Sequence, residues 1–342
     1  MNGCEAAPPS RIRTAVWVAG VVALVALVIC GCLLVPTLQT RWVVSDFDLH
    51  RAPDEPADET NQALVKRLGG SESAAARLKA YLASSRWLAP KKASAIMLLA
   101  ACGRHGVRPL EELLQSDDEG VRLRALRALS RMGSEARSAT PALVKALNDR
   151  EEKIRQGAAS LLGLIGAREQ STVSALARAL GDPDALVRAY AAGALGRIGD
   201  DAQSASRALT LALSDSDYRV RASAAHSLGQ IGGPHEGTIA KLRQLLGDSK
   251  LIVRIWAAWS LCRLDNTPED AIGVLRVLGT SKDVYLRKQA IGCLCLLAPT
   301  GAKAVLEVLE KARDDSDLEI RQMVASALAD AYLRAEPEEY NE

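Results

Sequence analysis

An arginine recurs along this chain at an almost constant interval, and this regularity constrains the fold more than any other feature. The interval is 33 residues five times in succession and 34 residues at the last step. Val, Ile or Leu precedes each arginine, and a leucine follows seven residues after it. The arginines are Arg122, Arg155, Arg188, Arg221, Arg254, Arg287 and Arg321. Self-similarity at such a period is typical of repeat architectures, so we expect an array of small similar units.

Each unit has the pattern of a helical hairpin. Asp or Ser stands six residues before the arginine, where its side chain can accept hydrogen bonds from the first amides of a helix. A glycine eleven residues after the arginine, such as Gly199, is placed to end that helix. A leucine twelve residues before the arginine, such as Leu176, marks a shorter helix upstream. One hairpin cannot bury its own apolar face, so we expect stability only from stacking.

The recurring Asp, Val-Arg, Ala-Ala and Leu-Gly-x-Ile-Gly elements over residues 106–336 resemble HEAT repeats, and in their shortness the variety found in phycobilisome lyases. The resemblance implies an all-α solenoid, an α-α superhelix of about eight hairpins. A degenerate first repeat is expected over residues 61–105, before seven regular ones. In such families the Asp and Arg usually form a hydrogen-bonded ladder between stacked repeats. This structural role falls to Asp149, Arg155, Asp182, Arg188, Asp215, Arg221, Asp248 and Arg254.

The N-terminal region predicts attachment to a membrane. Residues 15–35 include no charge and no proline, and as a helix they would span about 30 Å, the thickness of a bilayer core. We therefore expect a transmembrane helix over residues 15–38 after an N-terminal tail of residues 1–14. The short tail and its arginines favour a cytoplasmic N-terminus, with the repeats on the extracytoplasmic side. A cleaved signal peptide and a lipoprotein signal lipidated at Cys32 remain alternatives.

Charged and reactive residues offer little for catalysis. The four histidines do not recur in register, and no GxxxxGK, GxGxxG or HExxH motif is present. The net charge of +2 is too weak to indicate nucleic acid. Cysteines 102, 262, 293 and 295 occupy positions held elsewhere by small or apolar residues, so we expect free, buried thiols. Residues 39–60 form an acidic linker and residues 337–342 an acidic tail. We expect no enzyme activity, no metal and no cofactor.

The second helix of each repeat carries the most informative surface. The positions two, five and nine residues after the repeat arginine lie opposite its apolar side at 100° per residue, and we call them the ridge. In HEAT arrays this helix lines the concave face. The ridge is rich in Trp, Tyr and Arg, residue types that are enriched at interface hot spots. The candidate partner-binding residues are Trp256, Trp259, Arg263, Tyr190, Arg197, His226, Gln230, Arg124, Arg127 and Arg131.

These patterns favour a membrane-tethered scaffold that binds a protein or peptide partner in the concave groove without catalysis. The alternative is a protein that handles a chromophore as the phycobilisome lyases do, and only the repeat type supports it. A second alternative concerns the two ridge tryptophans, Trp256 and Trp259. They could pack against a neighbouring helix instead of a partner.

Overall fold

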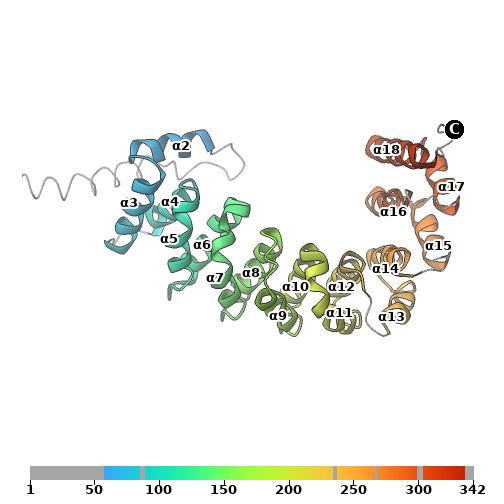
Figure 1. The fold of residues 1–342 in the computed structure, drawn as a ribbon, viewed down its shortest axis with the longest axis horizontal. Coiled ribbons are helices and arrows are strands. Elements are labelled where there is room, and N and C mark those ends of the chain that lie inside the picture. The colour runs from blue at the N-terminus through green and yellow to red at the C-terminus, as the bar shows by residue number, and fades with distance from the viewer. Residues whose placement is uncertain (1–57, 85–88, 234–236, 266–268, 299–302, 336–342) are drawn as a thin grey trace, which may run out of the picture. The chain divides into compact units, whose positions relative to one another are not determined.

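The computed structural model describes residues 58–84, 89–233, 237–265, 269–298 and 303–335. Within these ranges every regular element is a helix (Figure 1). The described part of the chain is therefore all-α, as the sequence predicts. The chain divides into two compact units, Met1–Met132 and Gly133–Glu342.

The first unit is built from paired helices packed in layers. Its described helices are α2 (Asp58–Arg67), α3 (Ser71–Ser84), α4 (Ala89–Ala100), α5 (Arg104–Leu113) and α6 (Glu119–Met132). Helix α3 packs against α5, and α4 packs against both α5 and α6. A Cβ atom at Gly106 would lie 1.9 Å from the carbonyl oxygen of Leu99, so this glycine lets α5 approach α4 closely. Helix α2 begins at Asp58, so the last three residues of the predicted acidic linker, 58–60, are helical.

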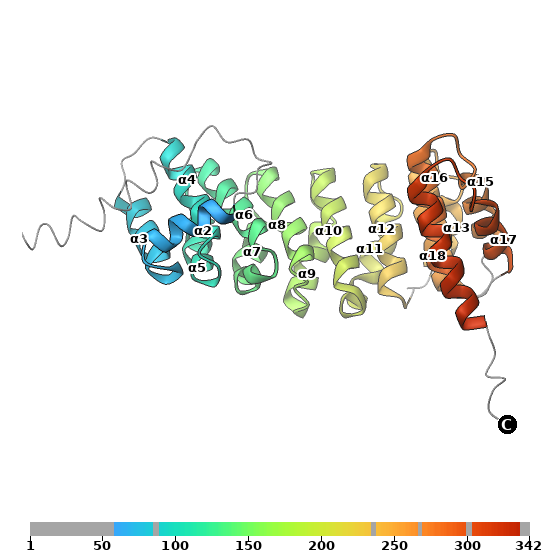
Figure 2. The same cartoon turned by 90° about the horizontal axis from the view of Figure 1, so that it is seen from above.

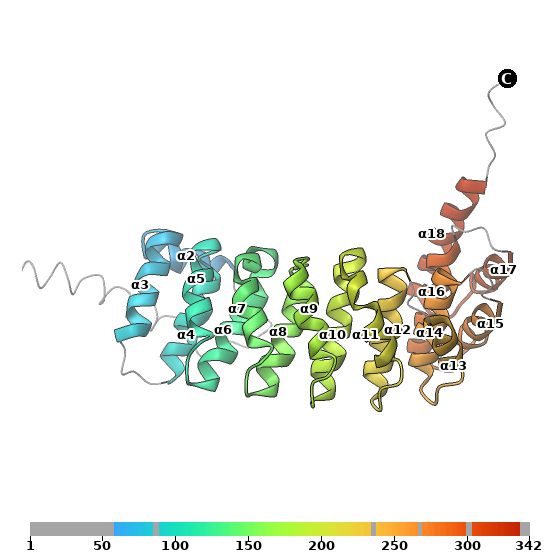
Figure 3. The same ribbon diagram turned by 60° about the horizontal axis from the view of Figure 1, so that its bottom comes forward.

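The second unit contains the regular repeats. Its elements are the 3₁₀ helix η1 (Gly133–Ala139), α7 (Thr140–Ala146), α8 (Glu152–Leu164), α9 (Gln170–Ala179), α10 (Ala185–Ile198), η2 (Gly199–Ala205), α11 (Ser206–Ala212), α12 (Tyr218–Ile231), α13 (Thr238–Leu245), α14 (Leu251–Leu264), α15 (Glu269–Leu278), α16 (Val284–Leu297), α17 (Lys303–Lys311) and α18 (Leu318–Ala335). The second helices α8, α10 and α12 lie side by side (Figure 2), and α14 packs next to α12 (Figure 3). Each also packs against the first helix of its own repeat, as α9 does against α10.

The start of the second helix differs from the prediction by two residues. The side chain of Asp184 caps α10 by accepting a hydrogen bond from the amide of Val187, and Asp217 caps α12 in the same way through the amide of Arg219. The predicted cap, Asp182, lies in the preceding turn, where its Oδ1 accepts from the amide of Asp184 at 2.9 Å. Its carboxylate is thereby held at the repeat boundary, facing the arginine of the repeat before.

Glycine ends the second helix as predicted. Gly199 follows α10 with a φ of 75°, a left-handed conformation that L side chains rarely adopt. The backbone then continues into η2 and reverses toward the next first helix. Gly232 has the equivalent place after α12, with a φ of 71°.

Small residues allow the second helices to pack closely. A Cβ atom at Gly163 of α8 would lie 2.7 Å from the Cα of Ala194 in α10, so only glycine fits there without a shift. Serines form hydrogen bonds between the following second helices. Ser227 Oγ of α12 donates to the carbonyl of Ala192 in α10 at 2.8 Å, and Ser260 Oγ of α14 donates to that of Ala225 in α12 at 2.6 Å. Both serines are fully buried. Close backbone approach therefore explains why Ala, Gly and Ser recur in the repeat.

One part of the predicted fold is corrected. Across the helices that the structure describes, none is both long and apolar enough to span a membrane. The predicted transmembrane helix over residues 15–38 lies outside the described ranges. The described residues support an α-helical repeat array, and the predicted single-pass membrane protein with extracytoplasmic repeats is not supported.

Candidate partner-binding site and the arginine ladder

Aspartate and arginine side chains join successive repeats of the second unit. Arg188 of α10 donates from Nε and Nη2 to both carboxylate oxygens of Asp215, at 2.8 and 2.9 Å, and these two side chains are 14% and 13% exposed. Its Nη1 donates to the backbone carbonyl of Asp182, at 2.9 Å. The guanidinium therefore connects the turn before its own helix to the turn of the next repeat. We call this series of pairs the arginine ladder.

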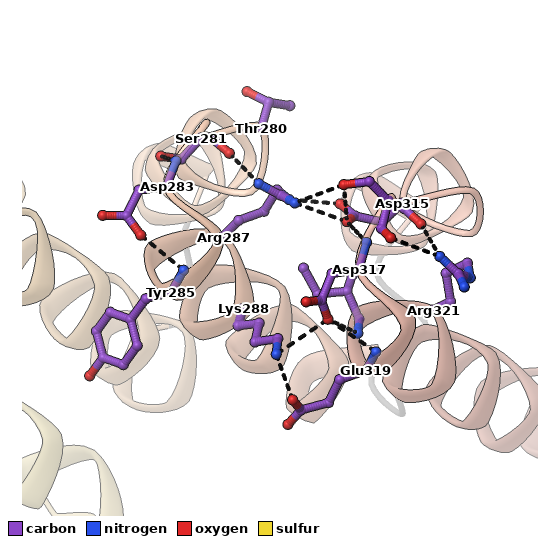
Figure 4. A network of polar contacts seen from close by, with 12 residues as sticks. Thr280, Ser281, Asp283, Tyr285, Arg287, Lys288, Asp315, Asp317, Glu319 and Arg321 are labelled. Carbon is purple, nitrogen blue, oxygen red and sulfur yellow. Dashed lines mark hydrogen bonds and ion pairs between the residues drawn. The ribbon is translucent and has the colours of Figure 1, made fainter.

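The same bidentate geometry recurs in register. The pairs are Arg155 with Asp182, Arg188 with Asp215, Arg221 with Asp248 and Arg287 with Asp315. Figure 4 shows the last of these, where Arg287 bridges the carbonyl of Ser281 and the carboxylate of Asp315. The sequence analysis did not include this pair in the ladder. Its two residues are 28 rather than 27 positions apart, and their geometry is the same. Asp149 lies in the equivalent turn, where its Oδ1 accepts from the amide of Glu151 at 2.9 Å.

Arg254 is the exception among the assigned ladder residues. Its Nε donates to the backbone carbonyl of Asp248, but within the described ranges it forms no ion pair with a carboxylate. Ser281 stands 27 residues after it, the spacing that separates Arg221 from its aspartate. Arg254 is thus wrongly assigned as a paired member, because the acceptor position of the following repeat lacks an acid.

The pKa values of Asp215, Asp248 and Asp315 in the ladder lie below the usual value of an aspartate. Hydrogen bonds from Arg287 are the main reason that the pKa of Asp315 lies below its usual value. Burial alone would raise the pKa of Asp215, but hydrogen bonds from Arg188 and the amide of Asp217 outweigh it and the net pKa is lowered. These aspartates are therefore ionised at neutral pH, and each ladder bond joins two full charges.

The ridge prediction places ten residues, and the structure distributes them over both units. Arg124, Arg127 and Arg131 lie on α6 of the first unit, where Arg124 is half-buried and the other two are exposed. The remaining residues lie on α10, α12 and α14 of the second unit, which pack side by side. The second unit therefore carries the aromatic part of the candidate site by itself.

An aromatic cluster spans α12 and α14. The ring of His226 lies 4.2 Å from that of Trp256 and 4.9 Å from that of Trp259, measured between centroids. The two indoles meet edge to face at 6.0 Å. Burial, and to a lesser extent the positive charge of Arg197 on α10, lowers the pKa of His226 to about 4. The histidine is therefore neutral at pH 7 and belongs to an apolar cluster.

Trp259 is not exposed as the helical wheel predicts. Only 4% of it is accessible, and its indole lies over Gly229 of α12, where a Cβ atom would be 2.6 Å from the ring. The absence of a side chain on the neighbouring helix leaves a gap that the indole fills. Its Nε1 is buried without a hydrogen-bond partner. Trp259 therefore packs against a neighbouring helix, which was the alternative for the ridge tryptophans. Trp256 is half-buried.

Polar and aromatic side chains surround this cluster on the accessible side. The Arg263 side chain is exposed, its Nε donates to the carbonyl of Gly229 at 2.7 Å, and its guanidinium carbon lies 5.2 Å from the Trp259 ring centre. On α10, Tyr190 is 43% exposed and Arg197 is exposed. Gln230 is half-buried and lies against Gly196. Arg263 is held in place by one contact with α12 of the preceding repeat, at Gly229, and by one within its own helix, at Trp259. The sequence pattern does not reveal the first, because it joins two repeats.

Groups for metal or redox chemistry are not gathered at this site. Among the described residues, no cluster of three or more His, Cys, Asp or Glu side chains could hold a metal ion. The described cysteines, Cys102, Cys262, Cys293 and Cys295, are free thiols. Burial raises the pKa of Cys293 to about 12, which keeps it protonated at neutral pH.

Comparison with known proteins gives the repeat its family. A model of HEAT repeats matches residues 140–211, 179–262 and 206–295, and one of the PBS lyase HEAT-like repeat matches residues 121–149. No curated protein is significantly similar to the chain in sequence.

Three solved structures are similar to this chain to different extents. An engineered protein from the Northeast Structural Genomics Consortium is 26% identical, with 80% of this chain and 81% of that chain covered and a TM-score of 0.49. Human deoxyhypusine hydroxylase in complex with glycerol is 20% identical, covering 79% and 99%, with a TM-score of 0.35. A homology model of the full-length AP-3 complex is 16% identical, covering 79% and 54%, with a TM-score of 0.52. At this identity the last likeness shows the fold alone.

Stacked helical hairpins joined by an arginine ladder define a class, the α-helical repeat scaffolds, which present one row of helices as a surface. The matched models narrow that class. The chain belongs to the HEAT-repeat proteins, whose arrays serve as scaffolds for protein interactions.

Proposed function

We propose that this protein is a non-catalytic scaffold that binds a protein or peptide partner along the ridge of α10, α12 and α14. The observation that carries the proposal is the arrangement on these three neighbouring helices of the accessible Tyr190, the half-buried rings of His226 and Trp256, and two exposed arginines. Arg263 is already fixed by its bond to Gly229 and its contact with Trp259, so little side-chain entropy is lost when a partner binds it.

Trp259 supports the proposal as a base for the surface. It fills the gap over Gly229 and holds Trp256 and Arg263 in place, whereas Trp256, Tyr190 and the arginines supply the accessible area. Aromatic and arginine side chains in such settings commonly contribute about 2 kcal/mol or more each to binding. The partner is expected to carry acidic and apolar groups that complement the arginines and the rings.

Site-specific crosslinking tests the proposal. A photo-reactive phenylalanine analogue replaces Tyr190 in the full chain, and a matched variant carries it at Tyr285 of α16, which is 61% exposed and outside the ridge. Illumination in cells that express the chain should link one defined protein at position 190 and not at position 285. Equal yields of the same adducts at both positions would contradict the ridge as the binding surface.

A second measurement gives the strength of the contact. Once the crosslinked partner is purified, Arg197→Ala and Arg263→Ala should each weaken its binding to the full chain by about tenfold or more without changing the melting temperature. Full affinity in both variants would also contradict the proposal.

A chromophore-handling function is the rival. The observation in its favour is the match of residues 121–149 to the PBS lyase HEAT-like repeat, which concerns the repeat type alone. Mixing the full chain with a bilin and scanning visible absorbance decides between the two proposals. A red shift that saturates at one bilin per chain would favour the rival.

A further inference from the structure

The gap in the arginine ladder lies next to a cavity. Arg155, Arg188 and Arg221 each bind a carboxylate 27 residues further on, and Arg287 binds one 28 residues further on. The residue 27 positions after Arg254 is Ser281. The fourth pair of the series is therefore missing, although the pairs before and after it are present.

Ser281 retains one of the two roles that aspartate has at this position. Its Oγ accepts from the amide of Asp283 at 3.2 Å, as Asp248 Oδ1 accepts from the amide of Lys250 at 2.8 Å, so the turn keeps its hydrogen bond. The hydroxyl carries no charge and cannot bind a guanidinium bidentately. The second role, a bidentate ion pair with the arginine of the preceding repeat, is not filled by any described residue.

The cavity has the chemistry of a binding pocket for an aliphatic acid. Its volume is about 300 Å³, and its walls include Leu246, Arg254, Val274, Val277 and Leu278. The apolar side chains come from α15 and the end of α13, and the arginine comes from the start of α14. The half-buried guanidinium of Arg254, which forms no ion pair with a described carboxylate, thus lies beside an apolar wall.

One acidic side chain, Asp270, also lines the cavity, and its nearest cation is Arg243. Asp270 Oδ1 accepts from the amide of Ala271 at 2.9 Å, and Oδ2 lies 3.7 Å from Nε of Arg243. Arg243 also binds Asp265 at 2.7 Å, so Asp270 shares this cation with a second carboxylate. No ion pair joins Asp270 to Arg254 within the described ranges.

We propose that this cavity binds the C-terminal carboxylate of a peptide or protein whose last residue is Leu, Val or Ile. In such a residue the carboxylate and the branched aliphatic group leave the same carbon atom, so both fit a space of this size. The carboxylate would take the place of the missing aspartate at Arg254, and the aliphatic group would lie against Val274, Val277 and Leu278. This site is separate from the ridge and goes beyond the proposed function.

An internal Asp or Glu side chain fits less well. An Asp or Glu side chain carries only methylene groups besides its carboxylate, so it offers no branched aliphatic group to the apolar wall. A second residue of the peptide would have to fold back to contact that wall. A phosphate group matches the arginine but leaves the aliphatic side chains without a contact. The combination of one cation and a small aliphatic wall therefore favours the chain end.

Methyl NMR on the full chain tests the proposal. The probe is the peptide acetyl-Ala-Ala-Val with a free carboxylate, and its C-terminal amide is the matched control. The acid should shift the methyl signals of Val274, Val277 and Leu278 to saturation, and the amide should bind at least tenfold more weakly, because charge-assisted hydrogen bonds are lost. Equal binding of acid and amide would overturn the proposal, and so would shifts confined to other methyl groups.

Two variants at Ser281 make the test independent of folding. Ser281→Asp supplies the missing carboxylate from within, so it should raise the melting temperature and abolish peptide binding. Ser281→Asn introduces a side chain with nearly the same shape as that of Asp but without the charge. It should leave peptide binding within about twofold of that of the unchanged chain. Peptide binding that survives Ser281→Asp would refute the site even though the protein is well folded.

Isovalerate distinguishes a chain end from a free small acid. It carries the same carboxylate and branched group without a peptide bond. The proposal predicts at least tenfold weaker binding of isovalerate than of the peptide, because the peptide backbone adds contacts at the cavity mouth. Equal affinities would overturn the assignment to a chain end.

Discussion

A double-mutant cycle on the central ladder pair tests how the repeats are held together. Arg188 donates four hydrogen bonds, two to the Asp215 carboxylate and two to the carbonyls of Asp182 and Pro183. Asp215→Ala removes the first two and leaves a largely buried guanidinium without its acid. At about 1–2 kcal/mol net for each charge-assisted bond, the free energy of unfolding should fall by roughly 2–4 kcal/mol.

Arg188→Ala should cost a similar amount, because it leaves the Asp215 carboxylate without its arginine and also frees two backbone carbonyls. The double variant loses the pair only once. We therefore expect its cost to be lower than the sum of the single costs by about 1–3 kcal/mol.

Urea unfolding followed by helical circular dichroism measures these costs, with amide hydrogen exchange to show that the loss is centred on α10 and α12. Arg219→Ala is the matched control, since Arg219 pairs with Asp217 at the surface and its loss should leave the unfolding midpoint unchanged. If the single costs add up within error in the double variant, the pair does not couple the repeats and the ladder has no stabilising role.

Three further predictions follow from the packing of the second helices. The pKa of His226 is lowered to about 4 in the folded chain, whereas an unfolded histidine has a pKa near 6.5, so between pH 4 and pH 6.5 the unfolded chain binds more protons. The free energy of unfolding should therefore fall by about 1 kcal/mol or more from pH 7 to pH 5. His226→Asn should remove this pH dependence in unfolding titrations. Trp259→Ala should lower the free energy of unfolding by about 3–5 kcal/mol because it empties the space over Gly229, whereas Tyr190→Ala should cost less than about 1 kcal/mol; similar melting temperatures for the two variants would contradict this. Gly163→Ala should destabilise the array by about 1–3 kcal/mol because the new methyl meets the Ala194 backbone, while Gly193→Ala, which meets nothing within 4 Å, should be neutral or stabilising in the same melting assay.

Much of the candidate site follows from repeat position, and part of it does not. Counting from the repeat arginine places Tyr190, Arg197 and Arg263 on the accessible side of their helices, where the structure has them. The same counting places Trp259 there, and it is buried. A helical wheel treats each helix alone, so it cannot include Gly229, which lies 30 residues earlier and shapes the surface that the indole meets.

The ladder shows the same division between local pattern and context. Regular spacing predicts that the arginine of one repeat meets the aspartate of the next, and the pair of Arg188 and Asp215 has this form. The spacing also led to Arg254 being treated as a paired residue, although Ser281 follows it in register. The cavity beside Arg254 has no counterpart in the sequence pattern, since its walls come from three separate helices.

The amino-acid sequence by itself determined the helical hairpin, the period of the array and the residues that join its repeats. These properties are repeated in every copy, so one pattern specifies all of them. The tertiary structure alone decided which ridge residues are accessible, which arginine has no acid and where a cavity forms. Each of these depends on one position that departs from the repeat pattern and on the residue that a neighbouring repeat has there. Gly229 leaves space for the Trp259 indole, and Ser281 replaces the aspartate that would pair with Arg254.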